Sequence, residues 1–167
     1  MYVSSILEVR PKILKSLGLK GILFDLDNTI VRRDSTSFQP EVSDLISEYR
    51  RYGLRLGIVS NNSRRRVETI AGTMDLPAVH RAVKPFVWPF RRALKILGTT
   101  PHETALIGDQ IFTDIFGGNM TGLYTILVVP MVGKEFWGTR FISRPLEKIV
   151  LARLKNKPEV LYGKWDQ

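Results

Sequence analysis

The feature of this sequence that most limits its fold is a regular alternation of short apolar runs with amphipathic segments. Each run has the length and composition of a buried strand, and each amphipathic segment repeats its apolar residues at helical spacing. The runs expected to form strands are residues 21–25, 54–59, 79–83, 104–107 and 123–129. The segments expected to form helices are residues 40–52, 64–73, 90–97, 113–119 and 145–154. Such alternation predicts a doubly wound, mainly parallel sheet in a three-layer α/β/α fold.

The length of the chain, 167 residues, indicates one domain. We expect a core over residues 21–155, an N-terminal extension over residues 1–20 and a basic tail over residues 156–167. The extension carries leucines and isoleucines among lysines, which favours a segment packed on the domain and leaves open a helix lying on a membrane surface. The longest apolar run, residues 123–131, is too short to span a bilayer, and no signal-peptide core is present, so we expect a cytoplasmic location.

The composition excludes several kinds of site and indicates the charge of the partner. The sequence has no cysteine, which excludes disulfides, thiolate metal sites and a cysteine nucleophile, and its two histidines cannot form a histidine-rich metal centre. It has 25 Lys and Arg against 16 Asp and Glu, a net charge of +9. Such a balance favours phosphate-rich partners, namely phosphorylated substrates, anionic lipid or nucleic acid.

Polar side chains stand where four of the expected strands end. These residues are Asp25 and Asp27, Ser60 and Asn61, Lys84, and Asp109 with Asp114. In an open parallel sheet the carboxyl ends of the strands meet at one edge, where ligands bind, so we expect these side chains to form one site. Its oxygen donors are those that Mg²⁺ requires.

These groups could together hydrolyse a phosphate monoester. A carboxylate can attack phosphorus, but an anionic nucleophile repels a dianionic phosphate unless positive charge lies nearby. Mg²⁺ and Lys84 would supply that charge, and Ser60 could donate to a phosphate oxygen beside the amides of the next helix. Asp27, two residues after Asp25, is placed to protonate the leaving oxygen and later to activate water.

The same residues resemble a known family pattern. Asp25-Leu-Asp-Asn-Thr29, Ser60, Lys84 and the segment 108–114 are similar, in order and spacing, to the four motifs of haloacid dehalogenase (HAD) superfamily phosphatases. The sequence FDLDNT, the later VSNN and GDQIFTDIFGGN, and a Gly-Thr-Arg from residue 138 more narrowly resemble the YqeG-like subfamily IIIA. At Met120 the sequence departs from this pattern, because an arginine is expected after GGN there.

The resemblance implies a HAD-like Rossmannoid fold and a role for each motif residue. Asp25 would be the nucleophile and Asp27 the general acid and base. Ser60 and Lys84 would bind phosphate, and we add the neighbouring Asn61 to this set. Mg²⁺ would be held by Asp25, the backbone carbonyl of Asp27, and Asp109. Asp114 matches the second acid of the fourth motif, whose role varies, and is expected to support the site.

Other candidate residues keep two readings each. The run from Arg64 to Arg66 could recognise a second anionic group of the substrate or form a solvated helix face. His80 could face the substrate, although a polar strand or surface position is the more common one. Trp88 and Trp137 are expected to be packing residues.

The spacing of the motifs leaves no room for a lid domain, which needs on the order of 50 residues, so we expect an open site without a cap. An open site favours a substrate that is large or anchored elsewhere. The leading hypothesis is a Mg²⁺-dependent phosphomonoester hydrolase with an aspartyl-phosphate intermediate. The resemblance extends to phosphatidylglycerophosphate phosphatases, which adds an anionic phospholipid at a membrane surface as a substrate. The alternatives are a soluble sugar or nucleotide monophosphate as substrate, or a catalytically idle nucleic-acid or ribosome-associated module, which only the charge supports.

Overall fold

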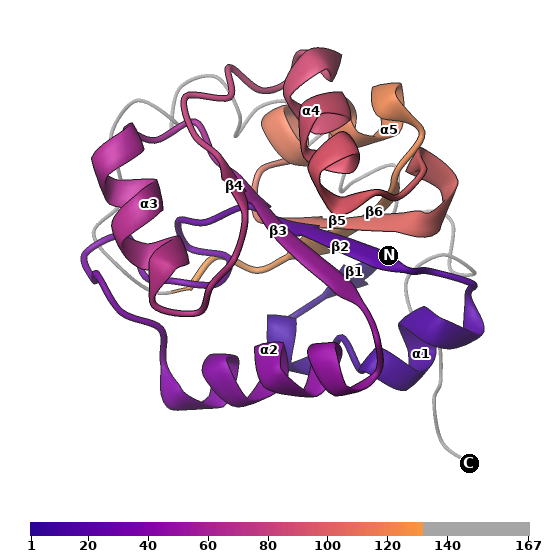
Figure 1. The fold of residues 1–167 in the computed structure, drawn as a ribbon, viewed down its shortest axis with the longest axis horizontal. Helices are drawn as coiled ribbons and strands as arrows, with labels where there is room; N and C mark the ends of the chain where they lie inside the picture. Colours follow the sequence, from indigo (N-terminus) through magenta and orange to yellow (C-terminus); the bar gives the residue numbers. More distant parts are fainter. Residues whose placement is uncertain (132–167) are drawn as a thin grey trace.

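The computed structural model describes residues 1–131, and its strands form one sheet with helices on both faces (Figure 1). The six strands lie in the order β1-β6-β5-β2-β3-β4, and every neighbouring pair is parallel. The predicted doubly wound α/β fold is therefore confirmed. The strands are β1 (Tyr2–Val3), β2 (Gly21–Phe24), β3 (Arg55–Val59), β4 (Ala78–Val79), β5 (Thr104–Gly108) and β6 (Tyr124–Val128). The helices are η1 (Ile6–Glu8), α1 (Pro11–Ser16), α2 (Pro40–Arg51), α3 (Arg64–Gly72), α4 (Val87–Leu97), η2 (Pro101–Glu103), η3 (Ile111–Phe116) and α5 (Gly117–Thr121).

The central strand β2 separates two hydrophobic cores. Successive side chains of a strand point to opposite faces of the sheet. Ile22 and Phe24 accordingly pack into the larger core beneath α1, α2 and α3, whereas Leu23 packs into the smaller core beneath α4. Because helices cover both faces, all four residues of β2 are buried, as its apolar sequence predicts.

The N-terminal extension belongs to the sheet and to the larger core. Strand β1 pairs with β6, so that Tyr2 lies opposite Leu127. Leu14 and Leu19 are fully buried, which excludes a helix that turns these side chains toward a membrane. The hydroxyl group of Tyr49 on α2 donates a hydrogen bond of 2.7 Å to the carbonyl of Val9, which holds the extension against the domain.

The structure departs from the predicted elements mainly after β3. The strand expected over residues 79–83 is limited to Ala78–Val79, because the chain then turns through positive φ angles of 47° at Arg81 and 56° at Val83. The helix expected over residues 113–119 is instead a π-helix, η3, which continues into α5.

The structure contradicts the expected role of Trp88, and several C-terminal expectations lie outside the described residues. Trp88 is 51% exposed, so it is not the packing residue that was predicted. The predicted helix over residues 145–154, the basic tail and Trp137 lie outside the described residues. Within residues 1–131, no helix is both long enough and apolar enough to cross a lipid bilayer.

Candidate active site

An open cleft of about 320 Å³ lies at the carboxyl ends of the central strands. It is lined by Asp25, Asp27, Arg33, Ser60, Asn61, Asn62, Ser63, Lys84, Gln110 and Thr113. The cleft therefore brings together the predicted residues that follow β2, β3 and β4. The chain passes from β2 to α2 and from β3 to α3 through loops, so no capping domain is inserted at either point.

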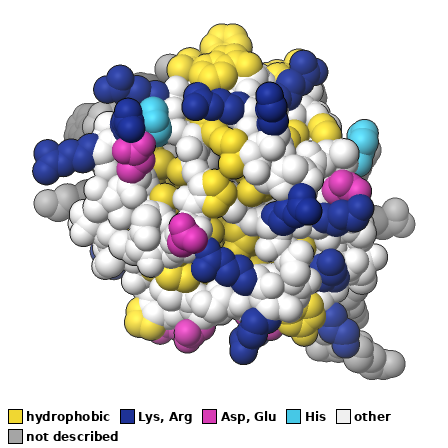
Figure 2. All heavy atoms as spheres, viewed as in Figure 1, with side chains coloured by type: hydrophobic (Ala, Val, Ile, Leu, Met, Phe, Trp, Pro, Cys, Tyr) yellow, Lys and Arg dark blue, Asp and Glu magenta, His cyan; other side chains and the backbone are white. Residues whose placement is uncertain are grey.

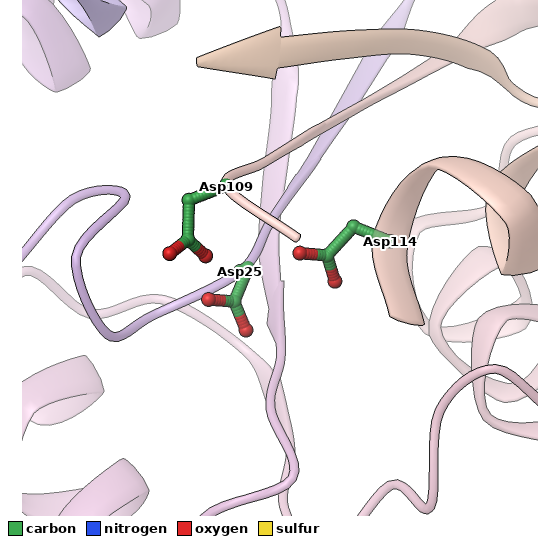
Figure 3. Close-up of side chains that lie close together, drawn as sticks. All are labelled: Asp25, Asp109 and Asp114. Carbon is green, nitrogen blue, oxygen red and sulfur yellow. The ribbon is translucent and has the colours of Figure 1, made fainter. Parts of the chain in front are cut away.

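Three carboxylates from two strands and a helix converge beside this cleft (Figure 3). Asp25 follows β2 and Asp109 follows β5, whereas Asp114 lies on η3. The strands bring the first two together, since the backbone N–H of Asp25 donates to the carbonyl of Ile107 at 2.8 Å. One carboxylate oxygen from each of the three residues lies within 4.8 Å of the others.

Gly108 allows the third carboxylate to approach. A Cβ atom at this position would lie 2.4 Å from the carboxyl group of Asp114, a distance that side chains do not tolerate. The backbone N–H of Gln110 also donates to this carboxylate at 3.1 Å. The glycine and the backbone of the fourth motif thus place Asp114 against the end of β5.

Lys84 bridges two of the three acids. Its Nζ atom donates to Asp25 at 2.5 Å and to Asp114 at 2.6 Å, and the lysine side chain is only 2% exposed. The backbone of Lys84 is held by the side-chain amide of Asn61, whose oxygen accepts from the lysine N–H at 2.7 Å and whose nitrogen donates to the lysine carbonyl at 3.4 Å. In this structure Asn61, predicted to bind phosphate, positions Lys84.

Burial and mutual repulsion shift the pKa values of the cluster. Burial, together with the nearby charge of Asp114, raises the pKa of Asp25 to about 7, although the ammonium group of Lys84 opposes this shift. Burial and repulsion by Asp25 raise the pKa of Asp109 to about 8. Burial alone would lower the pKa of Lys84, but its attraction to the two acids outweighs burial and raises the pKa above the ordinary value.

The composition of the cluster fits a hard divalent cation. It offers only carboxylate oxygens, which are the ligands that Mg²⁺ prefers. A bound cation would relieve the repulsion that raises the pKa values of Asp25 and Asp109. Both oxygens of Asp114 already accept hydrogen bonds, from Lys84 and from the N–H of Gln110, whereas Lys84 engages only Oδ1 of Asp25. Oδ2 of Asp25 and the carboxylate of Asp109 are therefore the freer donors. Two of the predicted metal ligands, Asp25 and Asp109, therefore belong to the cluster.

Asp27 is fixed by two residues that follow β3. Arg66 donates to its Oδ1 atom through Nε at 2.9 Å and through Nη2 at 2.7 Å. Asn62 donates to its Oδ2 atom at 2.7 Å. In this structure Arg66 is engaged with Asp27, whereas one reading of the run Arg64–Arg66 assigned it to a second anionic group of the substrate.

The contacts of Arg66 and Asn62 with Asp27 were not predicted from the sequence, although the run of three arginines after Ser60 was noted there. Successive residues of a helix point about 100° apart, so only one of three adjacent arginines can face a given site. Arg64 instead pairs with Glu68 at 2.8 Å, and Arg65 is exposed. Nothing in the sequence identified which of the three would face Asp27.

Ser60 lies buried at the floor of the cleft. Its hydroxyl accepts a hydrogen bond from the N–H of Asn62 at 3.2 Å, and its own N–H donates to the carbonyl of Val79 at 2.9 Å. The hydroxyl hydrogen remains available for a phosphate oxygen.

Two of the remaining candidates do not line the cleft. His80 approaches Glu68 at 3.9 Å. Met120, where the sequence departs from the family pattern, is 61% exposed on α5.

Comparisons with known proteins agree with this geometry. A family model described as "Hydrolase: haloacid dehalogenase-like hydrolase" matches residues 30–122. The chain is 36% identical over 166 residues to the probable phosphatase YqeG of Bacillus subtilis, which covers 99% of this chain and 94% of that protein. It is 28% identical over 153 residues to phosphatidylglycerophosphate phosphatase 1 of Arabidopsis thaliana, covering 86% of this chain but only 43% of that protein.

Solved structures with similar folds include CbbY from Rhodobacter sphaeroides in complex with phosphate. Its TM-score is 0.57 at 16% identity, over 72% of this chain and 91% of that chain. The cobalt-bound deoxy-D-mannose-octulosonate 8-phosphate phosphatase from Haemophilus influenzae has a TM-score of 0.56 at 14% identity, over 68% of this chain and 70% of that chain. The fold, the family-model match and the similarity to YqeG along almost the whole chain agree, and this chain belongs to the haloacid dehalogenase-like hydrolases.

Proposed function

We propose that this protein is a Mg²⁺-dependent phosphomonoester hydrolase that forms an aspartyl-phosphate on Asp25. The observation that carries the proposal is the arrangement of Asp25 in the cleft. Its Oδ1 atom is held by a buried lysine at 2.5 Å, and two further carboxylates stand close enough to share a cation with it. Few structural roles require a largely buried group of three acids and one lysine at the open edge of a sheet.

In the first step Asp25 attacks the phosphorus atom of the monoester. A bond forms between a carboxylate oxygen and phosphorus, the bond from phosphorus to the leaving oxygen breaks, and Asp27 gives its proton to that oxygen. Lys84 orients the nucleophile and offsets the negative charge of the phosphoryl group, while the Ser60 hydroxyl donates to one of its oxygens. Mg²⁺ bound by Asp25 and Asp109, with the carbonyl of Asp27 as a further ligand, would supply additional countercharge.

In the second step water hydrolyses the aspartyl-phosphate. Asp27 takes a proton from the water as its oxygen bonds to phosphorus, the bond between Asp25 and phosphorus breaks, and inorganic phosphate leaves. The Oδ1 atom of Asp27 already accepts two hydrogen bonds from Arg66, whereas Oδ2 accepts one from Asn62. A carboxylate oxygen has two lone pairs, so Oδ2 is the atom that we assign to proton transfer.

The open cleft favours a phosphate group carried by a large or anchored molecule. A small metabolite would leave this cleft exposed to water, whereas a bulky substrate completes its walls. Relatives named phosphatidylglycerophosphate phosphatase match much of this chain, at 28% and 23% identity. We therefore propose an anionic phospholipid monoester as the substrate class, with a soluble phosphomonoester as the second candidate.

The proposal is tested by phosphate release from p-nitrophenyl phosphate with Mg²⁺ and with a chelator. Asp25→Asn keeps the size of the side chain but removes the nucleophile, so we expect its kcat to be lower by about 10³-fold or more. Asp44→Asn, which changes an exposed acid on α2, is the matched control and should retain wild-type activity. Equal phosphate release by Asp25→Asn and wild type would contradict the assignment of the nucleophile.

The substrate class is tested on the wild-type protein. Phosphatidylglycerophosphate in vesicles is compared with a panel of soluble sugar and nucleotide monophosphates. We expect a higher kcat/KM for the lipid. A higher value for a soluble monoester would favour the second candidate.

A further inference from the structure

Four exposed aromatic side chains surround one side of the catalytic edge, and we call them the aromatic rim. Phe86 and Trp88 stand at the beginning of α4, with exposed fractions of 61% and 51%. Phe112 and Phe116 stand on η3, with exposed fractions of 45% and 49%. Large aromatic groups that remain exposed together in a folded protein commonly mark an interaction surface.

The two halves of the rim are brought together by a close backbone contact. A Cβ atom on Gly117 would lie 2.9 Å from the carbonyl oxygen of Pro85, so the chain next to Phe116 rests against the chain next to Phe86. The rings of Phe112 and Phe116 are stacked, with centroids 5.7 Å apart and planes 3° apart. The two segments that carry the rim are thus adjacent in the fold.

This surface borders the catalytic cleft. Phe112 precedes Thr113, which lines the cleft, and Phe86 follows the pair Lys84-Pro85. A partner that covers the rim would therefore lie next to the mouth of the active site.

Within the described residues, the two chain segments that form the rim carry no exposed carboxylate, and arginines follow one of them. The sequence has no acid between Asp75 and Glu103, and between residues 110 and 131 its single acid is the buried Asp114. Arg91 and Arg92 are exposed on α4, directly after the rim. Figure 2 shows hydrophobic side chains gathered at the top of the molecule, over the beginning of α4, with Lys and Arg side chains around them.

Arginines also line a hollow that adjoins the cleft. A second hollow, of about 480 Å³, is lined by Ser63, Arg64, Arg65, Glu68, Thr69 and Arg81. It shares Ser63 with the catalytic cleft, and its single carboxylate, Glu68, is paired with Arg64. The cleft thus adjoins the arginine-lined hollow at Ser63 and the aromatic rim near Thr113.

We propose that this edge of the protein docks on an anionic lipid surface, with the aromatic rim in the interface and the arginines on headgroup phosphates. Aromatic rings beside arginines, with Glu68 in the hollow already paired with Arg64, complement a surface that is apolar inside and negatively charged outside. In the docked protein the cleft faces the lipid headgroups. That a headgroup carries the substrate phosphate rests on the proposed function, whereas the docking itself does not. The membrane contact is thus placed at the catalytic edge and not on the N-terminal extension, where Leu14 and Leu19 are buried in the core.

The test is sedimentation of the full chain with phosphatidylcholine vesicles that contain about 30% phosphatidylglycerol or none. Wild type is expected to sediment with the anionic vesicles and to be released by salt. The Phe112→Ser/Phe116→Ser variant should bind about tenfold more weakly, because two rings no longer bury area in the interface. Phe86→Ser/Trp88→Ser, on the other segment, should weaken binding similarly and provides a second test if the first variant does not fold.

The control variant is Leu17→Ser/Tyr52→Ser, which removes side chains of similar exposure, 47% and 43%, next to the starts of β2 and β3. It should bind like wild type. Rim variants that bind vesicles as tightly as wild type would overturn the proposal. It would also be overturned if the wild-type protein bound single-stranded RNA or an acidic protein but not anionic vesicles. Sedimentation requires no catalysis, whereas hydrolysis of p-nitrophenyl phosphate requires no vesicles, so the two proposals can fail separately.

Discussion

Replacing Lys84 by methionine should destabilise the protein by an amount that depends on pH. Methionine fills a similar volume but leaves Asp25 and Asp114 buried without their shared counter-charge. Their oxygens lie within 4.8 Å of each other, and two unit charges at that distance repel by about 3 kcal/mol at an effective dielectric constant of about 20. Removing one partner of a buried ion pair costs a similar amount, about 3–5 kcal/mol. We therefore expect the free energy of unfolding to fall by about 3 kcal/mol at about pH 8.5 without metal.

The sign of the pH dependence follows from protonation of the acids. Burial raises the pKa of Asp25 to about 7 even beside Lys84, and loss of the ammonium group raises it further. A group whose pKa is higher in the folded than in the unfolded state stabilises the fold at low pH, and this contribution is lost as the pH rises through the folded-state value. The Lys84→Met variant should thus lose much less stability at about pH 5.5 than at about pH 8.5.

The assay is urea unfolding, followed by tryptophan fluorescence in the presence of a chelator, at both pH values. Lys20→Met is the control, since it removes an exposed lysine that pairs with Glu103 at the surface, and it should leave the free energy of unfolding nearly unchanged. An equal loss of stability at both pH values, or no loss at about pH 8.5, would refute the electrostatic reasoning.

Three further predictions follow from contacts described above. Arg66→Ala removes both hydrogen bonds to Oδ1 of Asp27, so steady-state kinetics should show kcat lower by about 10- to 100-fold with KM little changed, and Arg66→Lys should recover part of the loss. Mg²⁺ must compete with protons for the acids, and burial raises the pKa of Asp109 to about 8. The rise in melting temperature on addition of Mg²⁺ should therefore be small at about pH 5 and larger at about pH 8.5. A rise that does not depend on pH would contradict this prediction. Tyr49→Phe leaves the buried carbonyl of Val9 without its donor and should lower the free energy of unfolding by about 1–2 kcal/mol in urea, whereas an unchanged value would mean that water replaces the hydroxyl.

The fold could be predicted from the sequence wherever burial imposes a pattern. The apolar run of β2 and the stripe of Val42, Leu45, Ile46 and Tyr49 on α2 are such patterns, and the structure confirms both. Strand β1 has only two residues and is held by backbone hydrogen bonds, which no side-chain period reports. The strand expected to reach residue 83 stops at Val79, because the chain turns there through left-handed conformations that its apolar sequence does not indicate.

The candidate site was predictable to a similar depth. Parallel strands bring their carboxyl ends together, so residues that follow different strands can be assigned to one cleft from the sequence alone. The partners of each side chain depend on rotation about helix axes and on the path of loops. For this reason only the structure shows the hydrogen bonds from Arg66 and Asn62 to Asp27. The same is true of the hydrogen bonds between Asn61 and the backbone of Lys84.

The position of β2 between β5 and β3 also determines when during folding the site can exist. Lys84 lies 59 positions from Asp25 along the chain and 30 from Asp114, so the bridge between the two acids depends on contacts distant in sequence. Such contacts form late, because the entropy of closing long loops must be overcome first. A chain that has paired β2 with β3 but not yet with β5 has Asp25, the proposed nucleophile, without Asp109 beside it. A partly folded chain therefore carries the charges of the site without its proposed reactivity. Mg²⁺ should bind more tightly to the fully paired sheet than to partly folded chains, and should stabilise the folded state by that difference in affinity.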